Sequence, residues 1–294
     1  MSQHPVLVTG ASGSVGRLVV PLLLGAGVPV RSAAGSLERS IDPPAGPALS
    51  SIRLDFTEPA TWDAAYGGVR TMFLLRPPHL GRPRTQMVPS LRHAEALGVR
   101  HVVLLSLQGA ERNPAVPHAV LERWLRSSGM TWTFIRAAFF MQNLTTVHRD
   151  DIRERGEVVV PAGSGATAFV DAADVAAVAA AALLNPAVHR NVAWTPTGPR
   201  ALRYDEVAAI LSDVLHRPVS YTKPSPARYA RHARRTLGLP WGMVAVTTAI
   251  YSAARLGLAD GITDDVRRVL NRPPVDFETF ARREAESWQH PVSR

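Results

Sequence analysis

The chain has 294 residues, 46% of them hydrophobic, so it can bury a sizeable core in one large or two closely joined domains. It has no cysteine, which excludes disulfides, thiolate nucleophiles, thiolate zinc sites and iron–sulfur clusters. The formal net charge is +9, and arginine carries nearly all of the positive charge because Lys223 is the only lysine. No basic-then-apolar leader precedes the first expected strand and no apolar run reaches the length of a membrane span, so we expect a soluble cytoplasmic protein.

Strands and helices alternate through the first half of the chain. The predicted strands span residues 6–9, 28–33, 51–54, 69–75, 101–105 and 132–135. The predicted helices span residues 13–25, 58–66, 84–97 and 116–128. This alternation is typical of an α/β fold with a parallel sheet and helices on both faces. We therefore predict a Rossmann-type, doubly wound domain over residues 1–150.

The pattern loosens after about residue 140. Short strands are predicted at 156–161 and 192–194. Helices are predicted at 171–184, 204–215, 226–237, 241–256, 263–270 and 277–288. We expect a smaller, mostly helical C-terminal substrate lobe over residues 151–294, with some segments returning to the first domain.

A glycine motif follows the first predicted strand directly and opens the first predicted helix. Gly10, Gly13 and Gly16 have the spacing Gly-x-x-Gly-x-x-Gly. Glycines let the backbone approach a dinucleotide pyrophosphate closely, and the N–H groups at the start of a helix face the phosphate charge. We predict a pyrophosphate site formed by the backbone of Gly10, Ser12, Gly13, Ser14, Val15 and Gly16.

Several stretches resemble the NmrA-like atypical short-chain dehydrogenase/reductase family, above all its bacterial branch of NAD(P)-binding, quinone oxidoreductase-like proteins. They are residues 8–16, 54–56, 73–78, 102–106, 128–136, 139–144, 169–175 and 271–277. In the last stretch, Asn271 stands where the family's Gly-Arg-Pro-Pro element has glycine. The resemblance covers essentially the whole chain. It implies the Rossmann fold and a dinucleotide cofactor, and it does not name a substrate.

The resemblance also implies cofactor contacts outside the glycine turn. Asp55 and Phe56 are expected to flank the adenine, and the loop that begins with Leu75 and Arg76 is expected to run past the cofactor.

The ribose site departs from the family pattern, because Gly35 stands where the family often has arginine. No acidic residue that would bind a ribose 2′-hydroxyl ends the second strand, and Arg31 and Arg39 border the region. We therefore expect NADP(H) to be preferred over NAD(H).

The Tyr-x-x-x-Lys pair of classical short-chain dehydrogenases is absent, because Val219 lies four residues before Lys223. Ser106 ends the fifth strand, where the parent superfamily carries its active-site serine. His118 opens the next helix, with Glu122 one turn later. His118 can move a proton near neutral pH, or it can form an ordinary helix pair with Glu122.

Arg76 ends the fourth strand, in the crevice where such sheets bind ligands. It is either a clamp for an anionic group of the substrate or cofactor, or an exposed loop arginine. Ser106, His118 and Arg76 are thus the candidate catalytic residues.

Four residues after the sixth strand are expected to line the substrate side: Phe139, Phe140, Met141 and Asn143. A planar substrate such as a quinone would stack there, although core packing explains the two phenylalanines equally well. No metal is proposed, since the His/Glu pairs have no third ligand in the sequence.

The leading hypothesis is an NAD(P)H-dependent oxidoreductase that reduces a quinone or conjugated carbonyl compound. Such an acceptor needs little acid assistance, which fits the missing Tyr/Lys pair. Two alternatives remain open. One is a non-catalytic, NADP(H)-binding redox sensor with a protein partner. The other is a secondary-metabolite isomerase, cyclase or lyase that uses Arg76 and His118.

One arginine cluster has helical spacing: Arg228, Arg231, Arg234 and Arg235. It can bind an anionic partner or form a solvated helix face. We expect a small-molecule substrate, with no nucleic-acid and no membrane partner.

Overall fold

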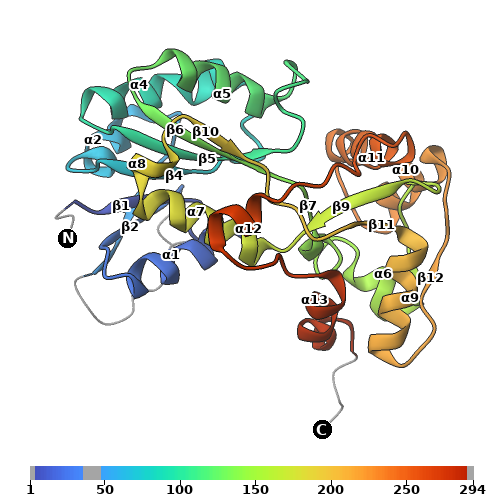
Figure 1. Cartoon of the computed structure of the whole chain (residues 1–294). Coiled ribbons are helices and arrows are strands. Elements are labelled where there is room, and N and C mark those ends of the chain that lie inside the picture. The colour runs from blue at the N-terminus through green and yellow to red at the C-terminus, as the bar shows by residue number, and fades with distance from the viewer. Residues whose placement is uncertain (1–3, 36–47, 290–294) are drawn as a thin grey trace, which may run out of the picture. The chain divides into compact units, whose positions relative to one another are not determined.

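The computed structural model describes residues 4–35 and 48–289 (Figure 1). Contacts divide the chain into two compact units. Unit 1 comprises the residues up to Ala138, Ala172–Pro196 and Asp265–Arg272, and unit 2 comprises Phe139–Asp171, Thr197–Asp264 and the residues from Pro273 onward. The sequence suggested a boundary near residue 150 with some later segments returning to the first domain; the contacts put the first boundary after Ala138 and assign two later segments to unit 1.

Unit 1 is built on a seven-stranded sheet with the order β10-β6-β5-β4-β1-β2-β3, in which every neighbouring pair is parallel. The strands are β1 (Val6–Thr9), β2 (Val30–Ala34), β3 (Leu49–Arg53), β4 (Thr71–Leu74), β5 (His101–Leu107), β6 (Thr131–Ala137) and β10 (Val192–Trp194). The predicted Rossmann-type sheet is confirmed.

Helices cover both faces of this sheet. They are α1 (Gly16–Gly25), α2 (Trp62–Tyr66), α3 (Pro83–Gln86), α4 (Val88–Ala96), α5 (Pro117–Ser127), α7 (Ala172–Leu184), α8 (Pro186–His189) and α12 (Asp265–Leu270). Figure 1 shows α1 and α7 on one face and α2, α4 and α5 on the other. Helix α7 is alanine-rich and buried along most of its length, and these small side chains let it pack closely on α1.

The single helix expected over residues 84–97 is divided at Met87 into α3 and α4. Pro89 lies in the first turn of α4, where a missing N–H is tolerated. The same proline cannot donate a hydrogen bond inside a continuous helix, so a new helix starts here.

Unit 2 combines helices with two small sheets, ordered β11-β9-β7 and β12-β8. Its strands are β7 (Phe139–Phe140), β8 (Glu157–Val158), β9 (Ala166–Val170), β11 (Ala201–Arg203) and β12 (Ser220–Tyr221). Its helices are α6 (Arg149–Arg155), α9 (Tyr204–Leu215), α10 (Pro226–Arg235), α11 (Trp241–Arg255) and α13 (Phe277–Arg283). The predicted helical character of this C-terminal part is confirmed, and β9 is a strand that the sequence did not predict.

The sheet of unit 1 has its switch point between β1 and β4. From β1 the chain continues to β2 on one side, whereas from β4 it continues to β5 on the other. Loops leaving the two carboxyl ends therefore diverge, and doubly wound folds bind ligands at such a switch point. The glycine turn follows β1, and Leu75 and Arg76 follow β4.

Two histidines are buried in structural positions. In unit 1, His101 lies within hydrogen-bond distance of the Thr131 and Thr133 hydroxyls, at 2.9 and 3.2 Å. In unit 2, His148 Nε2 lies 2.5 Å from the Tyr251 hydroxyl. Burial lowers the pKa of each to about 4, from 6.5.

This burial predicts a loss of stability in acid. Between pH 6.5 and 4 the unfolded chain binds protons that the folded chain rejects, so the free energy of unfolding falls as the pH falls. Each histidine is expected to remove about 2 kcal/mol at pH 5. Denaturant unfolding at pH 7 and pH 5 measures the difference.

The variant His101→Gln should show a shallower pH dependence than the parent protein. His216→Asn is the matched control, because His216 is exposed at a positive φ that asparagine tolerates. Equal stability of the parent at pH 7 and pH 5 would contradict this account.

Candidate cofactor and active site

The turn after β1 holds the start of α1 directly against the end of that strand. Gly10 has φ +62°, and a Cβ there would meet the Leu75 side chain at 3.0–3.4 Å. A Cβ at Gly16 would overlap the Gly10 carbonyl oxygen and lie 2.8 Å from Ala11 Cα. Glycine is therefore required at both positions, for backbone conformation and close approach.

The residues just before this helix present unused amides. In the described part of the chain, the N–H groups of Ser12, Ser14 and Val15 make no backbone hydrogen bond, and no side chain caps α1. Within the turn, Gly13 N–H donates to the Gly10 carbonyl at 2.9 Å. Free amides and the positive end of the helix dipole together fit the diphosphate of a dinucleotide.

Thr9 joins the two strands at the switch point. Its hydroxyl donates to the Phe73 carbonyl at 3.1 Å and accepts from Leu75 N–H at 2.8 Å. The loop after β4 is thereby fixed beside the glycine turn. Sequence reasoning did not assign this role to Thr9, because the pairing of β1 with β4 is not visible in the chain order.

Arg76 and His118 both lie in unit 1, near enough for the charge of Arg76 to lower the pKa of His118. Arg76 Nη1 donates to the carbonyls of Pro77, Pro78 and Leu80 at 2.9, 3.2 and 3.2 Å. Arg76 Nε and His118 Nδ1 are buried without a hydrogen-bond partner among the described residues.

Burial, and then the charge of Arg76, lower the pKa of His118 to about 4, while Glu122 acts in the opposite direction. His118 is therefore neutral at neutral pH, and it can offer a hydrogen bond there but not an imidazolium proton.

Ser106 and Glu122 belong to a buried network. The Ser106 hydroxyl donates to Glu122 Oε1 at 2.7 Å. Arg136 donates to the same carboxylate at 3.1 and 2.6 Å and contacts Glu111 at 3.2 Å. The Glu122 carboxylate thus bonds to side chains of β5 and β6 rather than to His118, its alternative partner within the helix. The same network gives the Ser106 hydroxyl a structural hydrogen bond rather than a free one.

The turn after β3 is held by hydrogen bonds of Asp55. Asp55 Oδ1 accepts from the Thr57 N–H at 2.8 Å and from its hydroxyl at 2.7 Å, and these bonds lower the pKa of Asp55. The Asp55 carbonyl accepts from Trp62 Nε1 at 2.9 Å. Phe56 is 5% exposed and packs in the core of unit 1, so its side chain faces inward.

Arg31 has a different partner from the expected ribose. Its Nη1 donates to the carbonyls of Ala64, Ala65 and Gly67 at the end of α2, at 3.2, 3.0 and 2.7 Å. Arg39, the second expected arginine, lies outside the described residues.

Arg53 is a guanidinium beside the end of β2 that sequence reasoning missed. Arg53 Nε donates to the Gly35 carbonyl at 3.3 Å, and its Nη1 donates to Glu58 at 2.9 Å. Only the pairing of β3 with β2 brings it to this place, since Ala34 and Arg53 are register partners.

The four expected substrate residues lie in unit 2. Met141 is 1% exposed and belongs to the core. Phe139 packs against Phe169 and Tyr251 with ring centroids 5.6 and 5.4 Å apart. Phe140 is half-buried on β7, and the Asn143 carbonyl accepts from His148 N–H at 3.1 Å. Core packing accounts for Met141 and for Phe139.

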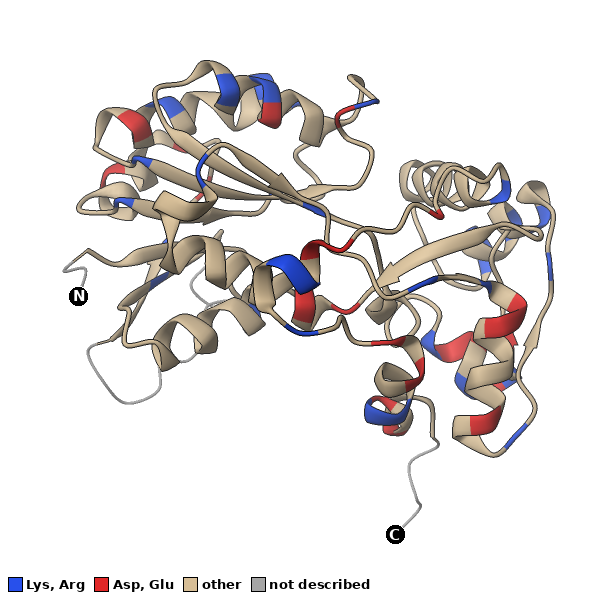
Figure 2. Cartoon of the chain, viewed as in Figure 1, with Lys and Arg blue, Asp and Glu red and all other residues tan. Residues whose placement is uncertain are grey.

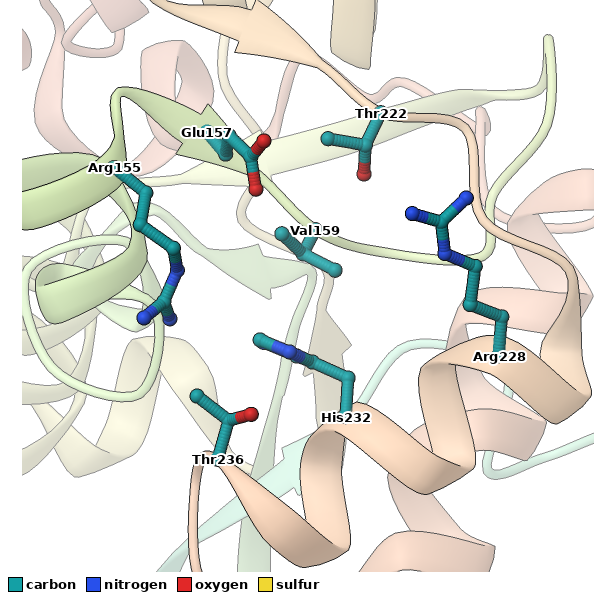
Figure 3. Close-up of a pocket in the computed structure, with 7 residues that line it drawn as sticks. All are labelled: Arg155, Glu157, Val159, Thr222, Arg228, His232 and Thr236. Carbon is teal, nitrogen blue, oxygen red and sulfur yellow. The ribbon is translucent and has the colours of Figure 1, made fainter.

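Unit 2 also holds two cavities of about 200 Å³. The first, of 210 Å³, is lined by Arg155, Glu157, Val159, Thr222, Arg228, His232 and Thr236 (Figure 3). Met141 and Phe169 are among the residues that line the second.

Within residues 4–35 and 48–289, no group of three or more His, Asp or Glu side chains is placed to hold a metal ion. No helix in the same ranges is long and apolar enough to cross a bilayer.

The close contact between Gly16 and Gly10 predicts that adding a single methyl group at Gly16 impairs both stability and cofactor binding. Gly16→Ala should destabilise the protein and raise the Kd for NADPH by at least about tenfold, because α1 must move away from β1. Calorimetric titration with NADPH and a thermal melt measure the two effects.

Gly25→Ala is the matched control in the same helix, since a Cβ there meets nothing within 4 Å. It should leave cofactor binding unchanged. A Gly16→Ala variant that binds NADPH as tightly as the parent would show that the turn is not the diphosphate site.

Comparison with known proteins places this geometry in context. Residues 10–186 match the sequence profile of a family described as NAD(P)H-binding. The chain is 36% identical to an NAD(P)H azoreductase of Xenophilus azovorans, over 96% of this chain and 99% of the azoreductase.

Two further proteins extend the comparison. The chain is 33% identical to a (4-alkanoyl-5-oxo-2,5-dihydrofuran-3-yl)methyl phosphate reductase of Streptomyces griseus, over 96% of this chain and 99% of that reductase. An NADPH-dependent quinone oxidoreductase of Escherichia coli, solved with NADPH, superposes with a TM-score of 0.84. It is 23% identical and covers 96% of this chain and 99% of its own, which shows the shared fold.

Proposed function

The chain belongs to the NAD(P)H-binding family, and from that premise we propose that it is an NAD(P)H-dependent oxidoreductase acting on a quinone or a conjugated carbonyl compound. The family resemblance expected from the sequence is confirmed. The observation that carries the proposal is the glycine turn at the switch point, with Arg76 and His118 in the same unit.

The residues present fit the cofactor. The amides of Ser12, Ser14 and Val15 would hold the diphosphate, and glycine at positions 10 and 16 lets the turn and α1 pack closely enough on β1 and Leu75 to present them. Bound NAD(P)H supplies a hydride. The protein contributes binding, orientation and electrostatics.

Arg76 and His118 suit an acceptor that gains negative charge. Three carbonyls hold the Arg76 guanidinium in place, and its buried Nε is free to donate to a developing oxyanion. Neutral His118 can donate a further hydrogen bond from Nδ1 in that tautomer. A quinone or conjugated carbonyl delocalises the incoming electrons, so hydrogen bonds replace the strong acid that a Tyr/Lys pair would supply.

The relatives support reduction of conjugated acceptors. One is an azoreductase, and the substrate of another contains a 5-oxo-2,5-dihydrofuran, an unsaturated lactone.

A redox sensor would need the same glycine turn, so cofactor binding alone does not distinguish a sensor from an oxidoreductase. Oxidation of the bound cofactor by an added acceptor distinguishes them, because a non-catalytic sensor would not consume it.

The test is NADPH oxidation with a panel of quinones and unsaturated carbonyl compounds. Arg76→Gln should lower kcat/KM by about 10- to 100-fold through loss of one charged donor, with a smaller change in the Kd for NADPH. Arg82→Gln, an exposed arginine in the same loop, is the control.

The pH profile adds a second readout. Because His118 is neutral above about pH 5, it should contribute no ionisation to kcat/KM between pH 6 and 8. An ionisation near pH 6.5 that disappears in His118→Asn would contradict its assigned state. Bound NADPH that no acceptor consumes would refute the oxidoreductase and favour the sensor.

We also propose that NADP(H) is preferred and that Arg53 recognises the 2′-phosphate. Arg53→Gln should raise the KM for NADPH about tenfold and change that for NADH less than about twofold, because only NADPH carries the extra phosphate. Steady-state kinetics with both cofactors measure the ratio.

Glu58→Gln is the paired control, since it removes the carboxylate that competes for Arg53 and keeps the guanidinium. It should leave the KM for NADPH equal or lower. Equal effects of Arg53→Gln on both cofactors would sink this assignment.

A further inference from the structure

The longest stretch of the chain without an acidic residue runs from Val214 to Ala259. It contains Arg217, Lys223, Arg228, Arg231, Arg234, Arg235 and Arg255. These residues account for most of the net charge of +9. The stretch includes α10 and α11, which pack against each other in unit 2, and these two helices carry basic but no acidic side chains (Figure 2).

Helix α11 is apolar on its solvent side. Val244, Tyr251 and Ala254 form its buried face. The exposed apolar side chains of the helix and the following turn are Trp241 (65% exposed), Met243 (39%), Val246 (52%), Ile250 (47%), Leu256 (72%) and Leu258 (71%). Exposed apolar residues grouped in this way mark an interaction surface.

The basic and apolar parts meet where Arg234 of α10 lies over Trp241 of α11. Arg234 lies with its guanidinium carbon 5.9 Å from the centroid of the Trp241 ring, and Arg231 and Arg235 are exposed on the same helix as Arg234. Arg228 instead lines the cavity of Figure 3 with Arg155 and Glu157. We therefore define the α10–α11 surface by Arg231, Arg234 and Arg235 together with the exposed apolar residues of α11.

We propose that the α10–α11 surface binds the face of a bilayer that contains anionic phospholipids. Arginines attract the negative headgroups, and a tryptophan with aliphatic side chains enters the boundary between headgroups and acyl chains. Such binding involves one leaflet of the bilayer and needs no membrane-spanning helix. The proposal therefore revises the expectation of no membrane partner, which was based on the lack of a membrane-spanning segment.

Two other occupants fit less well. In a two-fold dimer through this face, the arginines of both copies would crowd around the same contact and repel each other. A nucleic acid would use the arginines but leave the aliphatic side chains of α11 exposed, because phosphate contacts need no apolar surface. Charge and apolar area together favour lipid.

The experiment is flotation of the full chain with vesicles of phosphatidylcholine, with and without phosphatidylglycerol. Binding should require phosphatidylglycerol and weaken as salt is raised, because screening removes the attraction. Arg231→Glu/Arg235→Glu and, separately, Val246→Ser/Ile250→Ser should each lower the vesicle partition coefficient about tenfold or more.

Arg267→Glu/Arg268→Glu is the matched control, with the same charge change on exposed residues of α12 in unit 1. It should bind vesicles like the parent. NADPH affinity and thermal stability check that every variant is folded, and they also separate failure here from failure of the proposed reaction.

Three outcomes would overturn the proposal. The first is no flotation at low salt. The second is an unchanged partition coefficient in Val246→Ser/Ile250→Ser. The third is self-association, or binding to an oligonucleotide, that depends on these residues while vesicles are ignored.

Discussion

The close contact between Gly16 and the Gly10 carbonyl is the constraint on which the candidate site depends. A side chain at Gly16 would overlap that oxygen, so α1 begins directly against the end of β1. The amides of Ser12, Ser14 and Val15 are then presented at the switch point of the sheet. Thr9 fixes the neighbouring loop by binding the backbone on both sides of the end of β4.

The buried polar side chains of unit 1 that the sequence singled out fall into two groups: those with hydrogen-bond partners and those that keep an atom without one. Ser106 and Arg136 complete the hydrogen bonds of buried Glu122, which stabilises the sheet and leaves little chemistry to these groups. Arg76 and His118 each keep a buried polar atom without a partner in the described residues. Unpaired buried polar groups are costly unless a ligand satisfies them, which is why we propose Arg76 and His118 as the residues that contact the acceptor.

The fold could be predicted from the sequence because the order of strands and helices depends on residues that are close together in the chain. Alternation of strands and helices gave the parallel sheet, and β1, β10 and α9 were predicted with their observed limits. β9 was missed because nearly all of it is buried, so it lacks the alternation that identifies a strand. Contacts between elements that are distant in the chain could not be predicted in this way. They determine the partners of Arg31 and Glu122 and the position of Arg53.

The central claim is that the backbone at the start of α1 binds a nucleotide diphosphate. The most direct measurement is the change in amide chemical shifts on addition of NADPH to isotope-labelled protein. The account predicts large, saturable shifts for Ser12, Ser14 and Val15, with little change in α9 of unit 2. Saturable binding that leaves those three amides unmoved would contradict it.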